Sequence, residues 1–279
     1  MPRSQAAPAS RTPRRALAVL ASALLLLSGC SSTTPGEIAL PPGGARFDYQ
    51  LGGGYPPAEG VQLVVRDRED LPEPGLYSVC YVNAFQTQPG EREDWTGERA
   101  ELLLRDSSGT PVADPDWPDE VLLDVSTPAK REALIAIVAS WIAGCADSGF
   151  AAVEADNLDS ATRSQGLLSD SDTAAFAADL IEEAHRNGLA LGQKNAAERA
   201  PELRGLGFDF AITEECEAFD ECDAYTGVYG DRVYEVEYTD APEAVFERAC
   251  AARGDRIGVL QRDRDLLVPG EDGFVSRQC

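Results

Sequence analysis

Short runs of Val, Ile, Leu and aromatic residues recur along the chain between residues 47 and 261. Most of these runs are apolar over nearly their whole length, which is typical of strands buried on both faces. Nine runs are candidate strands: residues 47–51, 61–68, 77–85, 121–125, 151–156, 189–195, 208–214, 233–238 and 257–261. A closed barrel of parallel strands needs eight, so we expect one run to be an edge strand or part of a lid.

Two segments between these runs have apolar residues at helical spacing. Residues 130–145 form one such segment, and residues 172–187 form another, with Ser171 and Asp172 as candidate caps and Gly188 as the stop. Alternating strands and helices over about 235 residues predict an α/β fold, a (β/α)8 TIM barrel in one domain. The alternative is a doubly wound open sheet, but the sequence has neither of the glycine-rich phosphate-binding motifs.

Polar residues follow several of the later runs, where each strand should end. The C-terminal ends of barrel strands converge on one mouth, so these residues should meet there. Burying carboxylates together is unfavourable, whereas a glycosidase needs one carboxylic acid and one carboxylate at the bond it cleaves. We therefore predict Asp156 and Glu214 as the catalytic pair. The candidates for substrate contact are Asp48, Tyr49, Asp124, Glu154, Asn157, Lys194, Asn195, Glu215 and Glu237.

Each assignment has a structural alternative. Asp156 fits a helix cap or a turn, Glu214 fits an acidic rim, and Glu154 fits a salt bridge. Lys194 lies between the two catalytic candidates in sequence, where it could hold a carboxylate ionised or bind a sugar hydroxyl. The only histidine, His185, sits near a helix end, which argues against Ser-His-Asp or Cys-His catalysis. Trp95 and Trp117 fit either sugar stacking or core packing.

The chain is strongly acidic, with a net charge of −24. Removing an N-terminal leader with four arginines would leave −28, from 20 basic and 48 acidic residues. This charge argues against nucleic acid as a partner and favours a cationic or neutral substrate. The alternative is a solvated acidic surface.

The N-terminus is typical of an export signal. Four arginines precede an apolar run over residues 17–27, which ends in Leu27-Ser28-Gly29-Cys30. This ending resembles a bacterial lipobox, in which Cys30 is lipidated; the alternative is an ordinary signal peptide cut nearby. We expect a signal peptide over residues 1–29, a Ser-, Thr-, Pro- and Gly-rich tether over 30–44, and the barrel over 45–279. The protein would then be an exported cell-envelope lipoprotein anchored to the membrane.

Six cysteines remain when Cys30 is set aside: Cys80, Cys145, Cys216, Cys222, Cys250 and Cys279. An even number in an exported protein indicates three disulfides, with 15 possible pairings. Closeness in sequence favours pairing Cys216 with Cys222, and Cys250 with Cys279 would fix the C-terminal end, which leaves Cys80 for Cys145. A zinc site is the alternative, but no Cys-x-x-Cys is present, so we expect neither metal nor cofactor.

The segments around these residues resemble bacterial members of glycoside hydrolase family 114, the endo-α-1,4-polygalactosaminidase family. The resemblance runs from residue 47 to residue 279 and is carried by residues 47–53, 77–87, 116–120, 153–160, 192–195, 214–222 and 237–240. It implies a (β/α)8 barrel with an additional strand. It also implies catalysis by an Asp in a Glu-Pro-Asp-Asn motif and a Glu in a Glu-x-Cys motif, which match Asp156 and Glu214. Ala155 stands where the family often has proline.

The resemblance implies hydrolysis of α-1,4-linked galactosamine polymers, which are cationic when partly deacetylated. We expect a monomeric, endo-acting, retaining enzyme with Asp156 as nucleophile and Glu214 as acid/base, or with these roles exchanged. A sugar-binding surface lipoprotein without hydrolytic activity is the first alternative. A structural envelope lipoprotein is the second, and it would have no cleft lined by Asp156, Lys194 and Glu214.

Overall fold

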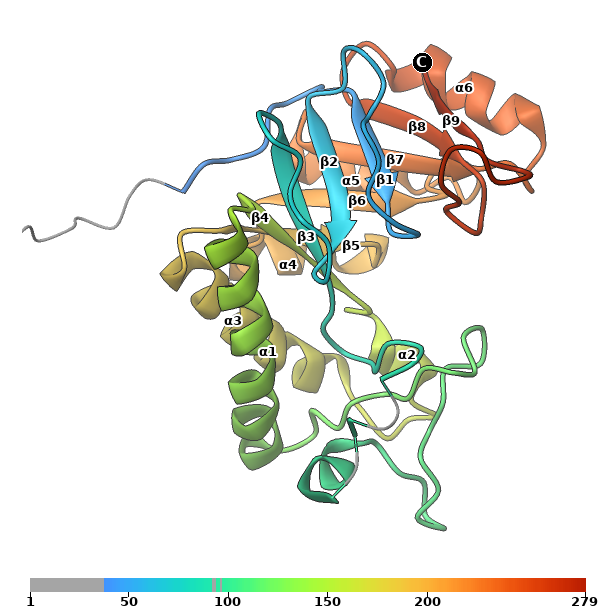
Figure 1. Cartoon of the computed structure of the whole chain (residues 1–279). Helices are drawn as coiled ribbons and strands as arrows, with labels where there is room; N and C mark the ends of the chain where they lie inside the picture. The colour runs from blue at the N-terminus through green and yellow to red at the C-terminus, as the bar shows by residue number, and fades with distance from the viewer. Residues whose placement is uncertain (1–37, 92–93, 96) are drawn as a thin grey trace, which may run out of the picture. The chain divides into compact units, whose positions relative to one another are not determined.

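The computed structural model describes residues 38–91, 94–95 and 97–279. The predicted signal peptide, Cys30 and most of the tether lie outside the described residues. Eight strands pair in parallel, each with the next along the chain (Figure 1). They are β1 Phe47–Gln50, β2 Leu63–Asp67, β3 Tyr77–Asn83, β4 Ala152–Asp156, β5 Ala190–Lys194, β6 Phe210–Glu214, β7 Val233–Tyr238 and β8 Gly258–Arg262. A ninth strand, β9 Ser276–Gln278, pairs antiparallel with β8.

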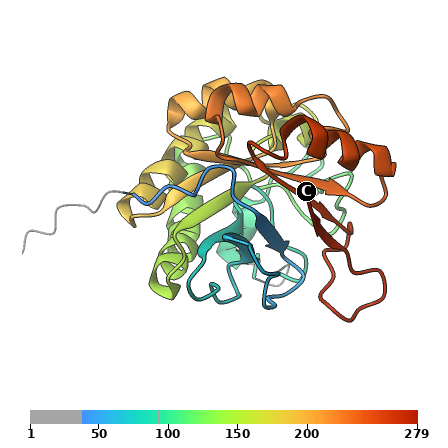
Figure 2. The same ribbon diagram turned by 90° about the horizontal axis from the view of Figure 1, so that it is seen from above.

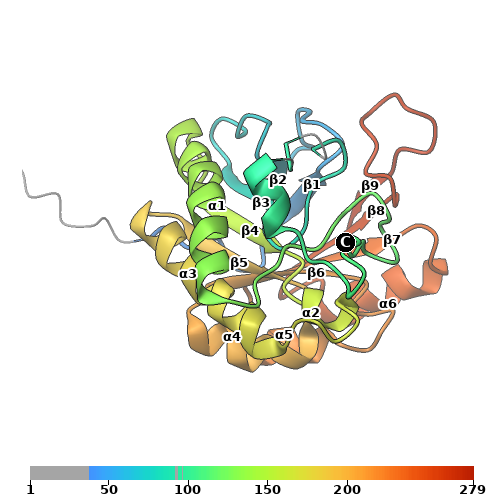
Figure 3. The same cartoon turned by 90° about the horizontal axis from the view of Figure 1, so that it is seen from below.

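The helices lie outside the strands and cover them from α1 round to α6 (Figures 2 and 3). They are α1 Pro128–Ser148, α2 Ser160–Arg163, α3 Asp170–Arg186, α4 Ala200–Leu206, α5 Cys222–Tyr229 and α6 Glu243–Arg253, with 3-10 turns η1 Gly97–Leu102 and η2 Ala197–Arg199. Residues 51–62 and 68–76, which follow β1 and β2, contain no helix. None of the described helices is long and apolar enough to cross a membrane. The predicted (β/α)8 TIM barrel with an additional strand is confirmed.

One of the nine candidate strands was expected to be an edge strand or part of a lid, and the run outside the barrel is residues 121–125; the additional strand, in contrast, was not among the nine. The run at residues 121–125 is not a barrel strand, because it makes only isolated bridges within the long connection between β3 and α1. It is apolar because Leu122 and Leu123 are fully buried there. The ninth strand is the polar segment Ser276–Gln278, which no apolar pattern marks. It joins β8 to β1 at the seam of the barrel, where the Gln278 side chain donates a hydrogen bond to the Phe47 carbonyl.

The N-cap of α3 lies two residues before the predicted Ser171. The N-cap is Ser169, whose hydroxyl accepts a hydrogen bond from the Asp172 amide, while the Asp172 carboxylate accepts one from the Ser169 amide. This reciprocal pair satisfies two amides that would otherwise lack partners at the helix start. Gly188, the predicted stop, follows the helix in a left-handed conformation with φ 75°.

Two apolar clusters stabilise the barrel. One fills its interior with residues such as Phe47, Tyr49 and Phe210, and the other packs between the strands and the surrounding helices. Gly192 on β5 leaves room for the Phe210 ring in the interior, because a Cβ at this position would lie 2.5 Å from that ring. The interior floor is therefore tightly packed, which fixes the directions of the side chains above it.

The structure contains three disulfides in the predicted pairing. Cys80–Cys145 joins β3 to α1, Cys216–Cys222 closes the loop after β6, and Cys250–Cys279 joins α6 to the C-terminal residue. The six cysteines proposed as disulfide partners are thus confirmed in that role.

Candidate active site

A cleft of about 1000 Å³ opens where the strands end. Its lining includes Asp156, Lys194 and Glu214, the last residues of the neighbouring strands β4, β5 and β6. The connection between β3 and α1 lies at this same end, toward which the β2 arrow points in Figure 1. This is the end of a parallel barrel at which enzymes of this fold place their active sites.

Lys194 is the centre of the charged groups and is only 2% exposed. Its Nζ lies 3.2 Å from Glu154 Oε1, 3.6 Å from Asp156 Oδ2 and 3.3 Å from Glu214 Oε2. It also donates a hydrogen bond of 2.7 Å to the Tyr49 hydroxyl. Burial acts to lower the pKa of Lys194, but the three carboxylates outweigh it and raise the pKa well above its usual value. The lysine is therefore a fixed positive charge.

Asp156 is held by the strand next to it and by its own loop. The Tyr81 hydroxyl donates to Oδ2 at 2.8 Å, and the Asn157 amide donates to Oδ1 at 2.7 Å. Asn157 has a left-handed backbone with φ 64°, and its side-chain amide donates to Asn83 Oδ1 at 2.8 Å. Both oxygens of Asp156 are thus directed by donors that the strand ends supply.

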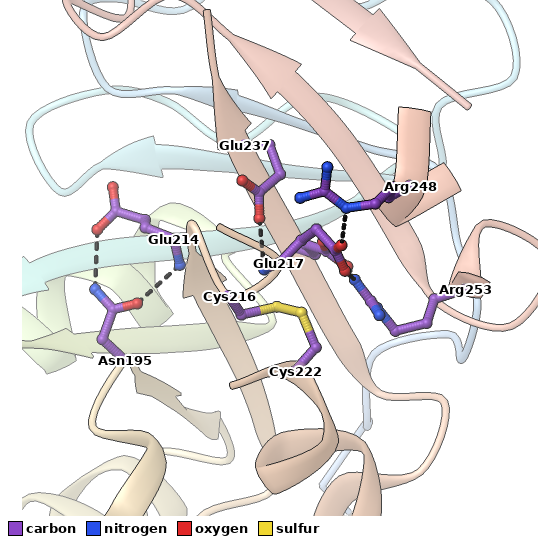
Figure 4. The surroundings of a disulfide bond; sticks show 9 residues. Asn195, Glu214, Cys216, Glu217, Cys222, Glu237, Arg248 and Arg253 are labelled. Atoms are coloured by element: carbon purple, nitrogen blue, oxygen red, sulfur yellow. Dashed lines mark hydrogen bonds and ion pairs between the residues drawn. A yellow bond between two sulfur atoms is a disulfide. The ribbon is translucent and has the colours of Figure 1, made fainter. Parts of the chain in front are cut away.

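Glu214 also has both oxygens occupied. Asn195 Nδ2 donates to Oε2 at 3.0 Å, and Asn195 Oδ1 accepts from the Glu214 amide at 2.8 Å (Figure 4). The Tyr238 hydroxyl donates to Oε1. Burial acts to raise the pKa of Glu214, but Lys194, Tyr238 and Asn195 together lower it below its usual value. In the free site Glu214 is therefore held as a carboxylate.

The two predicted catalytic carboxylates lie close together. Asp156 Oδ2 and Glu214 Oε2 each contact Lys194 Nζ, so these two oxygens are no more than about 7 Å apart. Retaining glycosidases have carboxyl groups about 5–5.5 Å apart, and inverting ones about 6.5–9.5 Å apart. The arrangement therefore suits a pair that acts on one glycosidic bond.

Glu154 lies beneath the cleft and not in its lining. It has no exposed surface, and its Oε1 accepts a hydrogen bond of 3.0 Å from the Tyr49 hydroxyl. Burial raises its pKa to about 7; Lys194 opposes this shift and Asp156 adds to it. The prediction that Glu154 contacts substrate fails because Lys194 and Tyr49 lie between it and the cleft.

Three other substrate-contact candidates lie away from the cleft. Asp48 contacts Tyr55, Ser276 and Gln50 on the outer side of β1. Asp124 pairs with Lys130 near the start of α1. The Glu237 side chain accepts a hydrogen bond of 2.9 Å from the Glu217 amide behind β7, and the Glu217 carboxylate pairs with Arg253 (Figure 4). Asp48 and Glu237 were wrongly placed because neighbouring residues of a strand face opposite sides.

The remaining candidates, Tyr49, Asn157, Asn195 and Glu215, do line the cleft. Glu215 forms an ion pair of 2.8 Å with Arg264, whose guanidinium lies over the Tyr238 ring. Trp117 also lines the cleft and is 56% exposed, whereas Trp95 is buried against Trp141.

Sequence reasoning missed several residues of the lining, among them Tyr81, Tyr238, Glu120, Arg163 and Arg264. Tyr81 and Tyr238 could have been found, because they occupy the inward positions of β3 and β7 near the strand ends. Arg163 follows β4 in the short helix α2 and pairs with Asp114 at 2.6 Å and with Asp159 at 2.7 Å. Nothing in the local sequence of the loop residues marks them as part of the site.

Comparison with known proteins agrees with this fold. The structure is similar to Ega3 of Aspergillus fumigatus in complex with galactosamine, with TM-score 0.68 and 19% identity over 87% of this chain and 98% of that chain. It is also similar to the glycoside hydrolase domain of PelA from Pseudomonas aeruginosa, with TM-score 0.58 and 18% identity over 81% and 97% of the two chains. No curated protein sequence matches the chain. The profile of glycoside-hydrolase family GH114 matches residues 30–279, and the chain therefore belongs to this family of glycosidases.

Proposed function

We propose that the protein hydrolyses α-1,4-linked galactosamine-containing polysaccharide, acting within the chain and with retention of configuration. The observation that carries the proposal is the pair of carboxylates, Asp156 and Glu214, on either side of Lys194 in an open acidic cleft. Membership of family GH114 supports the reaction class. The net charge of −24 and the galactosamine bound to Ega3 support a cationic amino-sugar substrate.

In the proposed mechanism one carboxylate attacks C1 of the sugar, and the other protonates the departing oxygen and then activates water. We assign Asp156 as nucleophile and Glu214 as acid/base. Because Glu214 has a lowered pKa in the free site, it must gain a proton when substrate changes its contacts with Lys194 or Tyr238. The exchanged assignment leaves Glu214 ionised as nucleophile but requires Asp156 to hold the proton beside Lys194, so the roles require a direct test.

The activity test compares the wild type with Asp156→Asn and Glu214→Gln on α-1,4-galactosamine oligomers, with new reducing ends as the readout. Each variant should lose at least about 10²-fold in kcat. Glu221→Gln removes a carboxylate from the cleft lining and should retain activity. Near-normal rates in either catalytic variant would refute the pair, and binding without new reducing ends in the wild type would identify a non-catalytic sugar-binding protein.

The roles are separated with an aryl α-galactosaminide whose leaving group needs little protonation. The acid/base variant should still form the glycosyl-enzyme and regain turnover with azide, giving a glycosyl azide of retained configuration. The nucleophile variant should form no glycosyl-enzyme, and any azide product it gives should have inverted configuration. The anomer released first, followed by NMR, tests retention. An initial β-anomer would refute it.

We also propose that the mature protein is a monomer attached to the outer face of a membrane by a lipid on Cys30. The apolar run followed by Leu27-Ser28-Gly29-Cys30 supports export and lipidation, and three disulfides agree with an oxidising compartment. Labelling with a fatty-acid analogue tests the anchor, with Cys30→Ala as the control that should lose the label and be released from membranes. Label that persists in Cys30→Ala would exclude this anchor.

A further inference from the structure

Glu120 is a carboxylate in the cleft lining that the mechanism above does not use. It lies in the connection between β3 and α1, where its backbone amide bonds to Trp117 and its carbonyl accepts from the Asp114 amide. Its residue exposure is 9%, although it lines the cleft. One carboxylate oxygen, Oε2, accepts a hydrogen bond of 2.9 Å from Asn83 Nδ2. The side chain is therefore anchored at one oxygen and nearly removed from bulk water.

Two asparagines connect Glu120 to Asp156. Asn83 is the last residue of β3 and is paired in register with Asp156 on β4. Its Oδ1 accepts from Asn157 Nδ2 at 2.8 Å, and the Asn157 amide donates to Asp156 at 2.7 Å. Glu120 and Asp156 thus share one network of short hydrogen bonds, so a sugar that reaches Asp156 also passes beside Glu120.

Glu120 differs from the neighbouring acids because, in the part of the chain that the structure describes, it forms no ion pair. Asp114 and Asp159 pair with Arg163, and Asp156 pairs with Lys194. Among the residues that the structure describes, no lysine or arginine forms an ion pair with Glu120. Burial raises the pKa of Glu120 to about 7; Asn83 and the more distant Arg163 oppose the shift, and Asp156 and Asp114 add to it. A buried carboxylate without a cation is unfavourable unless a ligand supplies one.

We propose that Glu120 binds the 2-ammonium group of the galactosamine unit whose C1 faces Asp156, and thereby makes the cleft prefer free amino sugar to its N-acetylated form. This inference rests on the proposed function. In galactosamine the amine is on C2, next to the carbon that the nucleophile attacks, so the group that recognises it must lie beside Asp156. Acetylation removes the positive charge and adds bulk against a side chain that has little free surface.

The test compares wild type, Glu120→Gln and Asp119→Asn on two substrates, fully deacetylated and fully N-acetylated α-1,4-galactosamine oligomers. Glutamine keeps an acceptor for Asn83 and removes only the charge. The kcat/KM of Glu120→Gln on the deacetylated oligomer should fall by about 10- to 100-fold, mainly through KM, because a charge-assisted hydrogen bond is lost. Its value on the acetylated oligomer should change by less than about threefold. Asp119 is the exposed neighbour outside the cleft lining and controls for net charge.

An equal fall on both substrates, or no fall on the deacetylated one, would overturn the assignment of Glu120. If the wild type cleaves neither oligomer, the proposed function fails and binding decides the role of Glu120. Calorimetry with galactosamine and galactose should then show tighter binding of galactosamine by the wild type and equal binding of both sugars by Glu120→Gln. Equal preference in the two proteins would exclude the ammonium contact.

Discussion

Replacing Lys194 with methionine tests the electrostatic basis of the site. Unit charges about 3.5 Å apart attract by about 5 kcal/mol at an effective dielectric constant of about 20. The Asp156 and Glu214 side chains are 18% and 27% exposed, so screening by water should reduce this to about 2 kcal/mol for each pair. About 1.4 kcal/mol corresponds to a factor of ten, so removing Lys194 should make an ionised carboxylate at this place about 10- to 100-fold less favourable and raise the pKa of Glu214, which Lys194 lowers.

The assay is the pH dependence of kcat/KM on galactosamine oligomers. The acidic limb reports ionisation of the carboxylate that must be charged in the free enzyme, so in Lys194→Met it should move to higher pH. Activity should therefore fall by about 10- to 100-fold on the acidic side and recover as the pH rises. Lys194→Arg keeps the charge and should keep the limb in place.

The other lysine of the chain provides a matched control. Lys130 pairs with Asp124 near the start of α1, and neither residue lines the cleft, so Lys130→Met should leave the profile unchanged. Circular dichroism checks folding, because removing one partner of a buried ion pair costs about 3–5 kcal/mol. A Lys194→Met profile that has the wild-type shape and only a lower amplitude would refute the electrostatic role and leave packing as the explanation.

Three further predictions concern stability, measured by chemical denaturation without reductant. Replacing Cys80 and Cys145 by alanine removes a bridge across 65 residues and should lower the free energy of unfolding by about 4 kcal/mol; a loss below about 1 kcal/mol would contradict the loop-entropy estimate. Gly192→Ala should cost about 1–3 kcal/mol because its Cβ would meet the Phe210 ring, and wild-type stability would show that the ring can move. Glu237 has a pKa raised to about 8, chiefly by burial, so the stability it contributes is present below its ordinary pKa and lost as the pH rises through about 8. Glu237→Gln should therefore gain stability relative to wild type between about pH 5 and about pH 9, and a constant difference would exclude this titration.

The barrel could be predicted from the sequence because each parallel strand is buried on both faces and therefore leaves a continuous apolar run. The same property misled at residues 121–125, where burial of Leu122 and Leu123 under the loop produces an equally apolar run. An apolar run indicates that a segment is buried, and a loop that covers the core is buried as well as a strand is. The short polar β9 leaves no such pattern, because side-chain hydrogen bonds such as that of Gln278 attach it to the seam.

The site was predictable where a polar residue ends a strand in the inward phase, as Asp156, Lys194 and Glu214 do. A shift of one residue reverses the face, which explains why Glu237 lies behind β7 while its neighbour Tyr238 contacts Glu214. The aromatic residues of β7 indicate which of its positions face inward, because Tyr234 and Tyr238 belong to the interior cluster. Loop residues such as Glu120 and Arg163 show no inward and outward alternation along the sequence. They reach the cleft only because the barrel closes.

The charge arrangement explains why the site should need a cationic substrate. Lys194 faces three carboxylates, and a buried ionic cluster of this kind is weak support for stability. The pKa of Glu154 near 7 means that a proton on Glu154 offsets part of the excess negative charge at neutral pH. The remaining negative charge lies at the mouth of the cleft, next to Glu120, which forms no ion pair among the described residues. The galactosamine unit that we propose as substrate would bring its ammonium group to that place, so its binding and the ionisation of Glu120 should favour each other.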